Sequence, residues 1–141
     1  MTWTRNLPTL TADGAQRAIA AGFAQATADD VNVSIAVLDP AARLLAFARM
    51  DGAPHISIAT SIKKAQTAVG FGVPTGQAWL DIAAGDPILE GGIAHLPDFI
   101  LLGGGVPIYV DGQVVGAVGV SGGHYAQDAR VAAAALKALE P

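Results

Sequence analysis

The sequence predicts a single α+β domain, residues 1–141, in which helices flank a mainly antiparallel sheet of about five strands. Three observations predict this fold class. A length of 141 residues matches one hydrophobic core of ordinary size, which uses about 100 to 150 residues. Apolar residues recur at helical spacing near both ends of the chain and at strand spacing between them. Two strand pairs are joined by turns of hairpin length, which connect antiparallel strands but cannot connect parallel ones.

The N-terminal part of the chain predicts one helix followed by a strand hairpin. Thr11 or Asp13 can cap the helix, along which small and apolar residues recur every three or four positions. From Val31 the pattern changes to alternation, which predicts a strand that ends at the turn dipeptide Asp39-Pro40. The segment 44–50 returns as its hairpin partner.

A second helix is expected over residues 57–69. Its predicted inner stripe consists of Ile58, Ile62, Ala65 and Val69. The same periodicity places Lys63 and Lys64 on the outer or flanking face.

The middle of the chain, residues 70–98, is rich in Gly and Pro and predicts loops with short helices near 77–84 and 87–95. Thr75 and Asp86 are the expected caps of these helices, and a proline follows Asp86 at the first helical position.

Three apolar runs, 99–102, 106–110 and 113–121, predict the central strands of the sheet. Asp111-Gly112 joins the last two runs and is a strong hairpin signal. Gly116 and Gly119 lie inside the last run, where a missing side chain often marks the close approach of a backbone or ligand. An Ala-rich helix over 126–139 closes the chain, with the acidic Asp128 in its first turn.

Composition excludes several classes of protein. The net charge is −4 and no basic stripe is present, so nucleic-acid binding is not expected. No run approaches about 18 consecutive apolar residues, and Met1–Pro8 lacks the pattern of a signal peptide, so we expect a cytoplasmic protein without a membrane span. Cysteine is absent, which excludes disulfides and thiol catalysis.

The surface chemistry predicts a homo-oligomer. Only 14% of the residues are charged whereas 52% are apolar, which leaves little polar material to cover a lone particle of this size. Part of the apolar surface should therefore be buried between subunits.

Five segments in order resemble the GlcG/HbpS family of haem-binding proteins, also called the haem-degrading domain family. The segments are V-L-D at the end of 33–39, F-A-R-M-D-G-A-P at 47–54, K-A-Q-T-A at 64–68, the glycine-rich run 103–123, and Q-D at 127–128. The resemblance implies a profilin-like fold and a ring-like assembly, between a tetramer and an octamer. It also implies a link to haem, and it extends to the C-terminal domain of PduO-type corrinoid adenosyltransferases.

Histidine side chains are the strongest candidate ligands for a haem iron in a chain without cysteine. His124 precedes the final helix, where it can ligate iron, act as a general base, or be an exposed loop residue. His55 follows Pro54 and has the same alternatives. His95 ends a short helix, where a cation favours the helix dipole, and we interpret it as structural.

Charged residues and glycines near element ends form a second candidate set. Arg49 and Asp51 share one face by alternation, so they can bind a polar ligand or only pair with each other. Lys64 matches the family's K-A-x-T-A segment and can contact a ligand or be a solvated surface charge. Gly103, Gly104 and Gly105 offer backbone N–H groups to a carboxylate or oxyanion, unless they only form a tight connection.

Two functions follow from these residues. In the first, the protein binds haem or another flat or carboxylate-bearing ligand, with Arg49 or Lys64 near the propionates and haem supplied by the resemblance. In the second, it is a cofactor-free isomerase, tautomerase or deaminase that acts on a small carboxylate-bearing metabolite, with His124 or Asp51 moving the proton. We favour binding, because no known catalytic motif is present.

Overall fold

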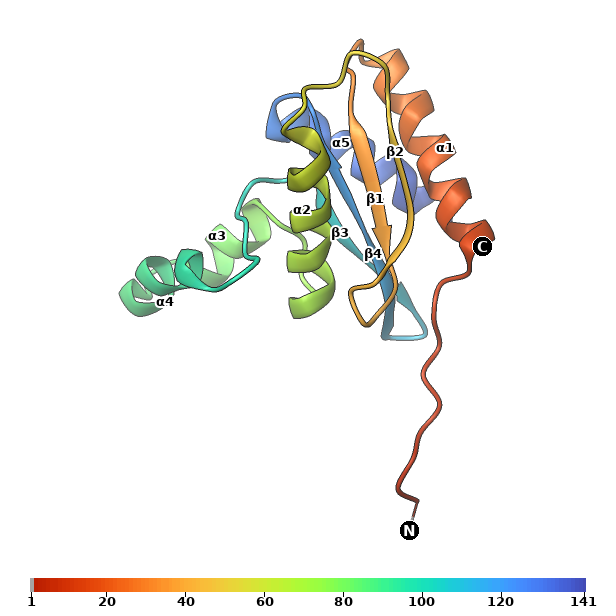
Figure 1. Cartoon of the computed structure of the whole chain (residues 1–141). Coiled ribbons are helices and arrows are strands. Elements are labelled where there is room, and N and C mark those ends of the chain that lie inside the picture. The colour runs from red at the N-terminus through yellow and green to blue at the C-terminus, as the bar shows by residue number, and fades with distance from the viewer. Residues whose placement is uncertain (1) are drawn as a thin grey trace.

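The computed structural model describes residues 2–141 and contains one antiparallel sheet with helices on both faces (Figure 1). The sheet has four strands in the order β2-β1-β4-β3. Their bounds are β1 Ser34–Leu38, β2 Leu44–Arg49, β3 Gly105–Val110 and β4 Gln113–Ser121. The helices are α1 Ala12–Ala28, α2 Ser57–Phe71, α3 Gln77–Ala83, α4 Pro87–Gly92, the 3-10 turn η1 Ile93–His95, and α5 Tyr125–Lys137.

The two faces of the sheet are covered differently. Helices α1 and α5 pack against each other and bury the larger apolar core on one face (Figure 1). Helix α2 alone covers the opposite face, over a smaller cluster of Leu38, Ala65, Ala68 and Ala117. The α+β class with an antiparallel sheet flanked by helices is therefore confirmed, whereas the profilin-like topology stays an expectation.

The predicted number of strands is wrong, because the apolar run 99–102 is not a strand. Phe99 is buried edge-on against the rings of Trp79 and Phe71, with centroid separations of 5.5 and 6.0 Å. The backbone N–H of Ile100 donates to the Thr67 hydroxyl at 3.0 Å. Aromatic packing thus buries the Phe99 side chain, and the Thr67 hydroxyl satisfies the Ile100 N–H, so neither needs a neighbouring strand.

The predicted position of β3 also needs correction. Among residues 2–141 its only neighbour in the sheet is β4, so it forms an edge, while β1 and β4 are central. The hairpin at Asp111-Gly112 is confirmed, since β3 pairs antiparallel with β4 and Val110 lies opposite Gln113.

The inner face of α2 differs from the predicted stripe. Its buried residues are small or polar: Ser57, Ser61, Lys64, Ala65, Thr67 and Ala68. The close approach of helix and sheet explains this choice, because a Cβ on Gly119 of β4 would collide with the Ser61 carbonyl oxygen and lie 2.7 Å from the Ala65 nitrogen. The close backbone contact expected at Gly119 is confirmed, and the outward position expected for Lys64 is wrong.

The expected caps are confirmed at two of three helices. The Thr11 hydroxyl accepts from the Gly14 N–H at 3.1 Å and the Asp86 carboxylate accepts from the Leu89 N–H at 3.0 Å. Thr75 does not cap α3, whose N-cap is Gly76. Within residues 2–141, none of the helices has the length and apolar character needed to cross a membrane.

Candidate functional site

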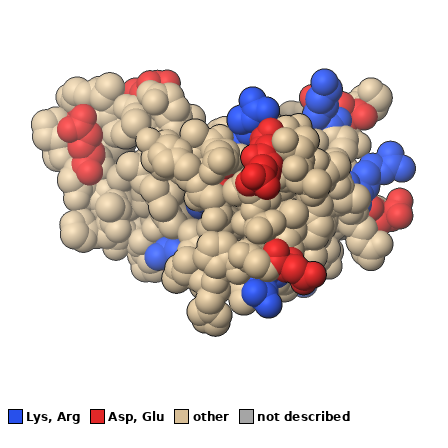
Figure 2. All heavy atoms as spheres, turned by 90° about the horizontal axis from the view of Figure 1, so that it is seen from above, with Lys and Arg blue, Asp and Glu red and all other residues tan. Residues whose placement is uncertain are grey.

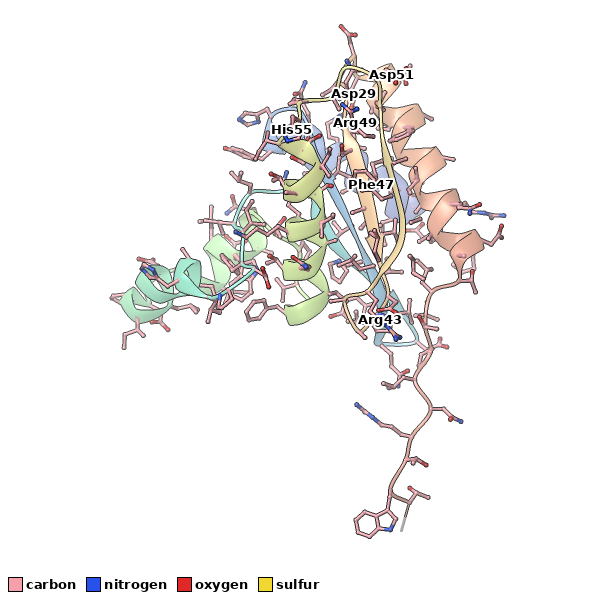
Figure 3. The ribbon with its side chains drawn as sticks, viewed as in Figure 1. Asp29, Arg43, Phe47, Arg49, Asp51 and His55 are labelled. Atoms are coloured by element: carbon pink, nitrogen blue, oxygen red, sulfur yellow. The ribbon has the colours of Figure 1, made fainter. Side chains whose placement is uncertain are left out.

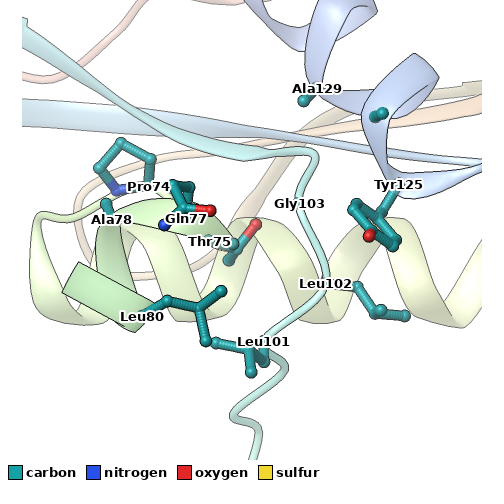
Figure 4. Close-up of a pocket in the computed structure, with 12 residues that line it drawn as sticks. Pro74, Thr75, Gln77, Ala78, Leu80, Leu101, Leu102, Gly103, Tyr125 and Ala129 are labelled. Atoms are coloured by element: carbon teal, nitrogen blue, oxygen red, sulfur yellow. The ribbon is translucent and has the colours of Figure 1, made fainter. Parts of the chain in front are cut away.

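A pocket of about 570 Å³ opens between the start of α3, the connection that leads into β3, and the first turns of α5 (Figure 4). Its volume lies within the range of about 300 to 1,000 Å³ that is usual for small-molecule sites. The lining residues are Pro74, Thr75, Gly76, Gln77, Ala78, Leu80, Leu101, Leu102, Gly103, Tyr125, Ala126 and Ala129. Segments from the middle and the end of the sequence therefore form its walls.

No lining residue of this pocket carries a charge. Leu80, Leu101 and Leu102 supply apolar surface, and the Tyr125 ring faces the same space from α5 (Figure 4). The Thr75 hydroxyl accepts from the Gly105 N–H at 2.9 Å. The pocket is thus suited to an apolar ligand and offers no cation to a small carboxylate.

A buried ion pair lies directly behind the pocket wall. Lys64 of α2 and Asp128 of α5 are 1% and 2% exposed, and the Lys64 ammonium lies 2.9 Å from the Asp128 carboxylate. The ammonium also donates to the carbonyl of Val120 at 2.9 Å. The second carboxylate oxygen of Asp128 accepts from the Gly123 N–H at 3.0 Å. The pair therefore joins α2, the end of β4 and α5.

Burial dominates the titration of Lys64. Desolvation lowers the pKa of Lys64 below its usual value, while the hydrogen bond and the charge of Asp128 act in the opposite direction. The Val120 carbonyl and the Asp128 carboxylate hold the Lys64 ammonium in place. The ammonium would have to leave both acceptors to contact a ligand in the pocket. Lys64 thus positions the wall and does not line the pocket.

The three glycines of the predicted oxyanion site have separate roles. Gly103 lines the pocket. Gly104 has φ +125° and a Cβ there would lie 3.0 Å from the Lys64 ammonium nitrogen, so only glycine fits. Gly105 donates to Thr75. The structure therefore brings the glycines close to Lys64, and they form a tight backbone connection that lies against the Lys64–Asp128 ion pair.

His124 is the N-cap of α5. Its Nδ1 accepts from the Ala126 N–H at 3.1 Å, and Gln127 completes a capping box by accepting from the His124 N–H at 2.9 Å. The imidazole packs on the Tyr125 ring, with centroids 4.0 Å apart. Iron ligation through Nε2 would require a proton on Nδ1 and would therefore break the cap.

Arg49, Asp51 and His55 lie at one end of the sheet and do not line the pocket (Figure 3). Arg49 donates weakly to the Ala53 carbonyl at 3.5 Å, and all three side chains are exposed. Ser34 of β1 lies opposite Arg49 on one side and Ser121 on the other. His124 follows Ser121 by three residues, so it leaves the sheet at the same end. The structure thus places the predicted residues in two groups, and their roles as ligand contacts stay predictions.

The comparisons with known proteins agree with the fold and its sequence motifs. Residues 10–137 match the model of the family described as "Haem degrading protein HbpS-like". The chain belongs to the HbpS-like family. It is similar to Protein GlcG of Escherichia coli K12, with 41% identity over 105 residues, which cover 73% of this chain and 74% of GlcG.

Two solved structures carry the same fold over nearly the whole length. Klebsiella pneumoniae ORFY is 32% identical, with a TM-score of 0.88 and coverage of 99% of this chain and 96% of ORFY. A complex of PduOC with haem is 28% identical, with a TM-score of 0.84 and coverage of 92% and 94%. The GlcG/HbpS resemblance predicted from the sequence is confirmed.

Sequence reasoning missed three residues of the candidate site. Tyr125 lines the pocket, Thr75 fixes the glycine connection, and Asp128 is the partner of Lys64. Lys64 and Asp128 both lie in family-matching segments, and that shared membership was the available signal for their pairing. Among residues 2–141, no three His, Asp or Glu side chains cluster as a metal site.

Proposed function

We propose that this HbpS-like protein binds haem, or another flat and mostly apolar ligand, in the pocket beside Gly103. The observation that carries the proposal is the size of the pocket together with its uncharged lining of leucines and one tyrosine. The family description and the haem complex of the related PduOC support haem as the ligand. The charged propionates would then lie at the open side of the pocket, away from the leucines.

Tyr125 is the lining residue best suited to hold the iron. Its phenol oxygen belongs to the set of protein groups that ligate haem iron, whereas the other lining side chains are amides, hydroxyls or hydrocarbons. The adjacent His124 uses its Nδ1 for the helix cap. Bound haem would supply redox chemistry, and the chain would supply an apolar slot and one oxygen ligand.

The alternative of a cofactor-free enzyme gains no support from this geometry. Proton transfer needs a base within about 3 Å of the substrate. Asp51 and His124 do not line the pocket, and neither Arg49 nor Lys64 reaches it to hold a carboxylate. The homo-oligomer of four to eight subunits and the cytoplasmic location stay predictions.

A paired substitution tests the iron ligand. We expect Tyr125→Phe to shift the absorption spectrum of bound haemin and to weaken binding about tenfold, because the ring remains and only the oxygen is lost. His124→Asn should leave both the spectrum and the affinity unchanged, because asparagine preserves an N-cap while removing the imidazole. The opposite pattern would assign the ligand to His124, which is one of the alternatives that the sequence left open.

A further inference from the structure

No side chain of the N-terminal arm, residues 2–9, is buried against its own subunit. All its side chains are exposed, including Trp3 at 88% and Leu7. Its described residues form no backbone–backbone hydrogen bond, and the first such bond in the chain joins the Leu10 N–H to the Val115 carbonyl. Figure 1 shows the arm extending away from the body of the protein.

The arm is long enough to reach another molecule. Pro8 fixes its own φ and favours an extended conformation at Leu7. Eight extended residues span about 26 Å, whereas the radius of gyration of a domain of this length is about 14 Å. An exposed indole at the end of such a segment has a large apolar surface to bury.

The lobe formed by α3, α4 and η1, residues 77–95, projects from the other side of the molecule (Figure 1). Helix α4 packs on α3 and η1. A groove of about 430 Å³ on this lobe is lined by Asp86, Ile88, Leu89, Gly92, Ile93 and Leu96. Ile88 is 87% exposed, so the groove has an apolar rim with no cover from its own chain.

Charges on the arm and the lobe are complementary. The lobe contains Asp81, Asp86 and Glu90 and no Lys or Arg, and its surface carries red patches in Figure 2. Arg5 is the only charged residue of the arm. A partner that combines an aromatic side chain with a positive charge is therefore present within the same sequence.

We propose that the N-terminal arm of one copy docks in the α4–η1 groove of a second copy, with Trp3 as the apolar anchor and Arg5 facing the acidic lobe. The inference does not rest on the ligand pocket, because neither the arm nor the residues of the α4–η1 groove line it. Its occupant is a second copy of this chain.

Complementation between two variants tests this contact in solution. Trp3→Ala removes the anchor and leaves the groove, whereas Ile88→Asp spoils the groove and leaves the arm. We expect each variant alone to have at least a tenfold larger dissociation constant than the wild type in light scattering. A mixture of the two should associate more tightly than either alone, because one intact arm then meets one intact groove.

Other outcomes would overturn the proposal. A wild type with the mass of a single chain at micromolar concentration would exclude the contact, and so would unchanged association of Trp3→Ala. Failure of the mixture to associate would show that arm and groove do not meet. Leu44→Asp, on an exposed leucine of β2, serves as the control for surface charge. Haemin binding by each variant reports separately on the pocket and on folding.

Discussion

Replacing Lys64 with methionine is expected to lower the free energy of unfolding by about 3–5 kcal/mol, because it leaves the Asp128 carboxylate buried without its cation. The ion pair also connects α2 with the end of β4 and the first turn of α5. Urea unfolding of the wild type and Lys64→Met measures the loss directly.

Two companion variants separate this effect from the loss of any ion pair. The Arg130–Asp29 pair also has a short contact, at 3.1 Å, but Arg130→Ala should destabilise the protein far less than Lys64→Met, because the Arg130 side chain is 67% exposed and solvent screens the pair. The double variant Lys64→Met/Asp128→Asn should recover part of the loss, since no buried charge remains. A cost at Lys64 no larger than that at Arg130 would contradict the role given to the buried pair.

Replacing Gly119 with alanine is expected to destabilise the protein by about 3 kcal/mol. A methyl group there would meet backbone atoms of α2, the Ser61 carbonyl oxygen and the Ala65 nitrogen, and neither can turn aside as a flexible side chain could. The helix would have to move away from the sheet. Thermal or urea unfolding of Gly119→Ala measures the cost.

Gly70→Ala is the matched control for this substitution. Gly70 lies in α2, the helix that Gly119 of β4 contacts, and a Cβ added to Gly70 would have no neighbour within 4 Å. Alanine is favoured over glycine in a helix by about 1 kcal/mol, so this variant should be slightly more stable than the wild type. Equal destabilisation by the two alanines would show that the helix and sheet are not in close contact at Gly119.

The elements with strong local signals could be predicted closely from the sequence. Asp111-Gly112 determines the β3–β4 hairpin, and Thr11 and Asp86 cap the helices expected to follow them. The run 99–102 misled because hydrophobicity alone does not distinguish a central strand from an irregular segment in which Phe99 is buried and Leu101 and Leu102 are exposed. Its conformation depends on Trp79 and Thr67, which are distant in sequence.

The site was less predictable, because its parts depend on tertiary contacts. Helical periodicity places Lys64 outside the apolar stripe, and the pairing that buries it involves a residue 64 positions away. His124 was interpreted from its position before a helix, and its capping box with Gln127 was not evident because that sequence motif normally has Ser or Thr at the N-cap. No local pattern could show that Leu101 and Leu102 would face Tyr125 across a pocket.

Titration of haemin into the wild type, Leu102→Asp and Leu44→Asp, followed by absorption, tests the proposed pocket most directly. The two leucines are similarly exposed, at 48% and 53%, but only Leu102 lines the pocket. We predict one haem per chain for the wild type and Leu44→Asp. Leu102→Asp should bind at least about tenfold more weakly, because a carboxylate would lie against an apolar ligand. No haemin binding by the wild type, or equal binding by all three proteins, would contradict the proposed site.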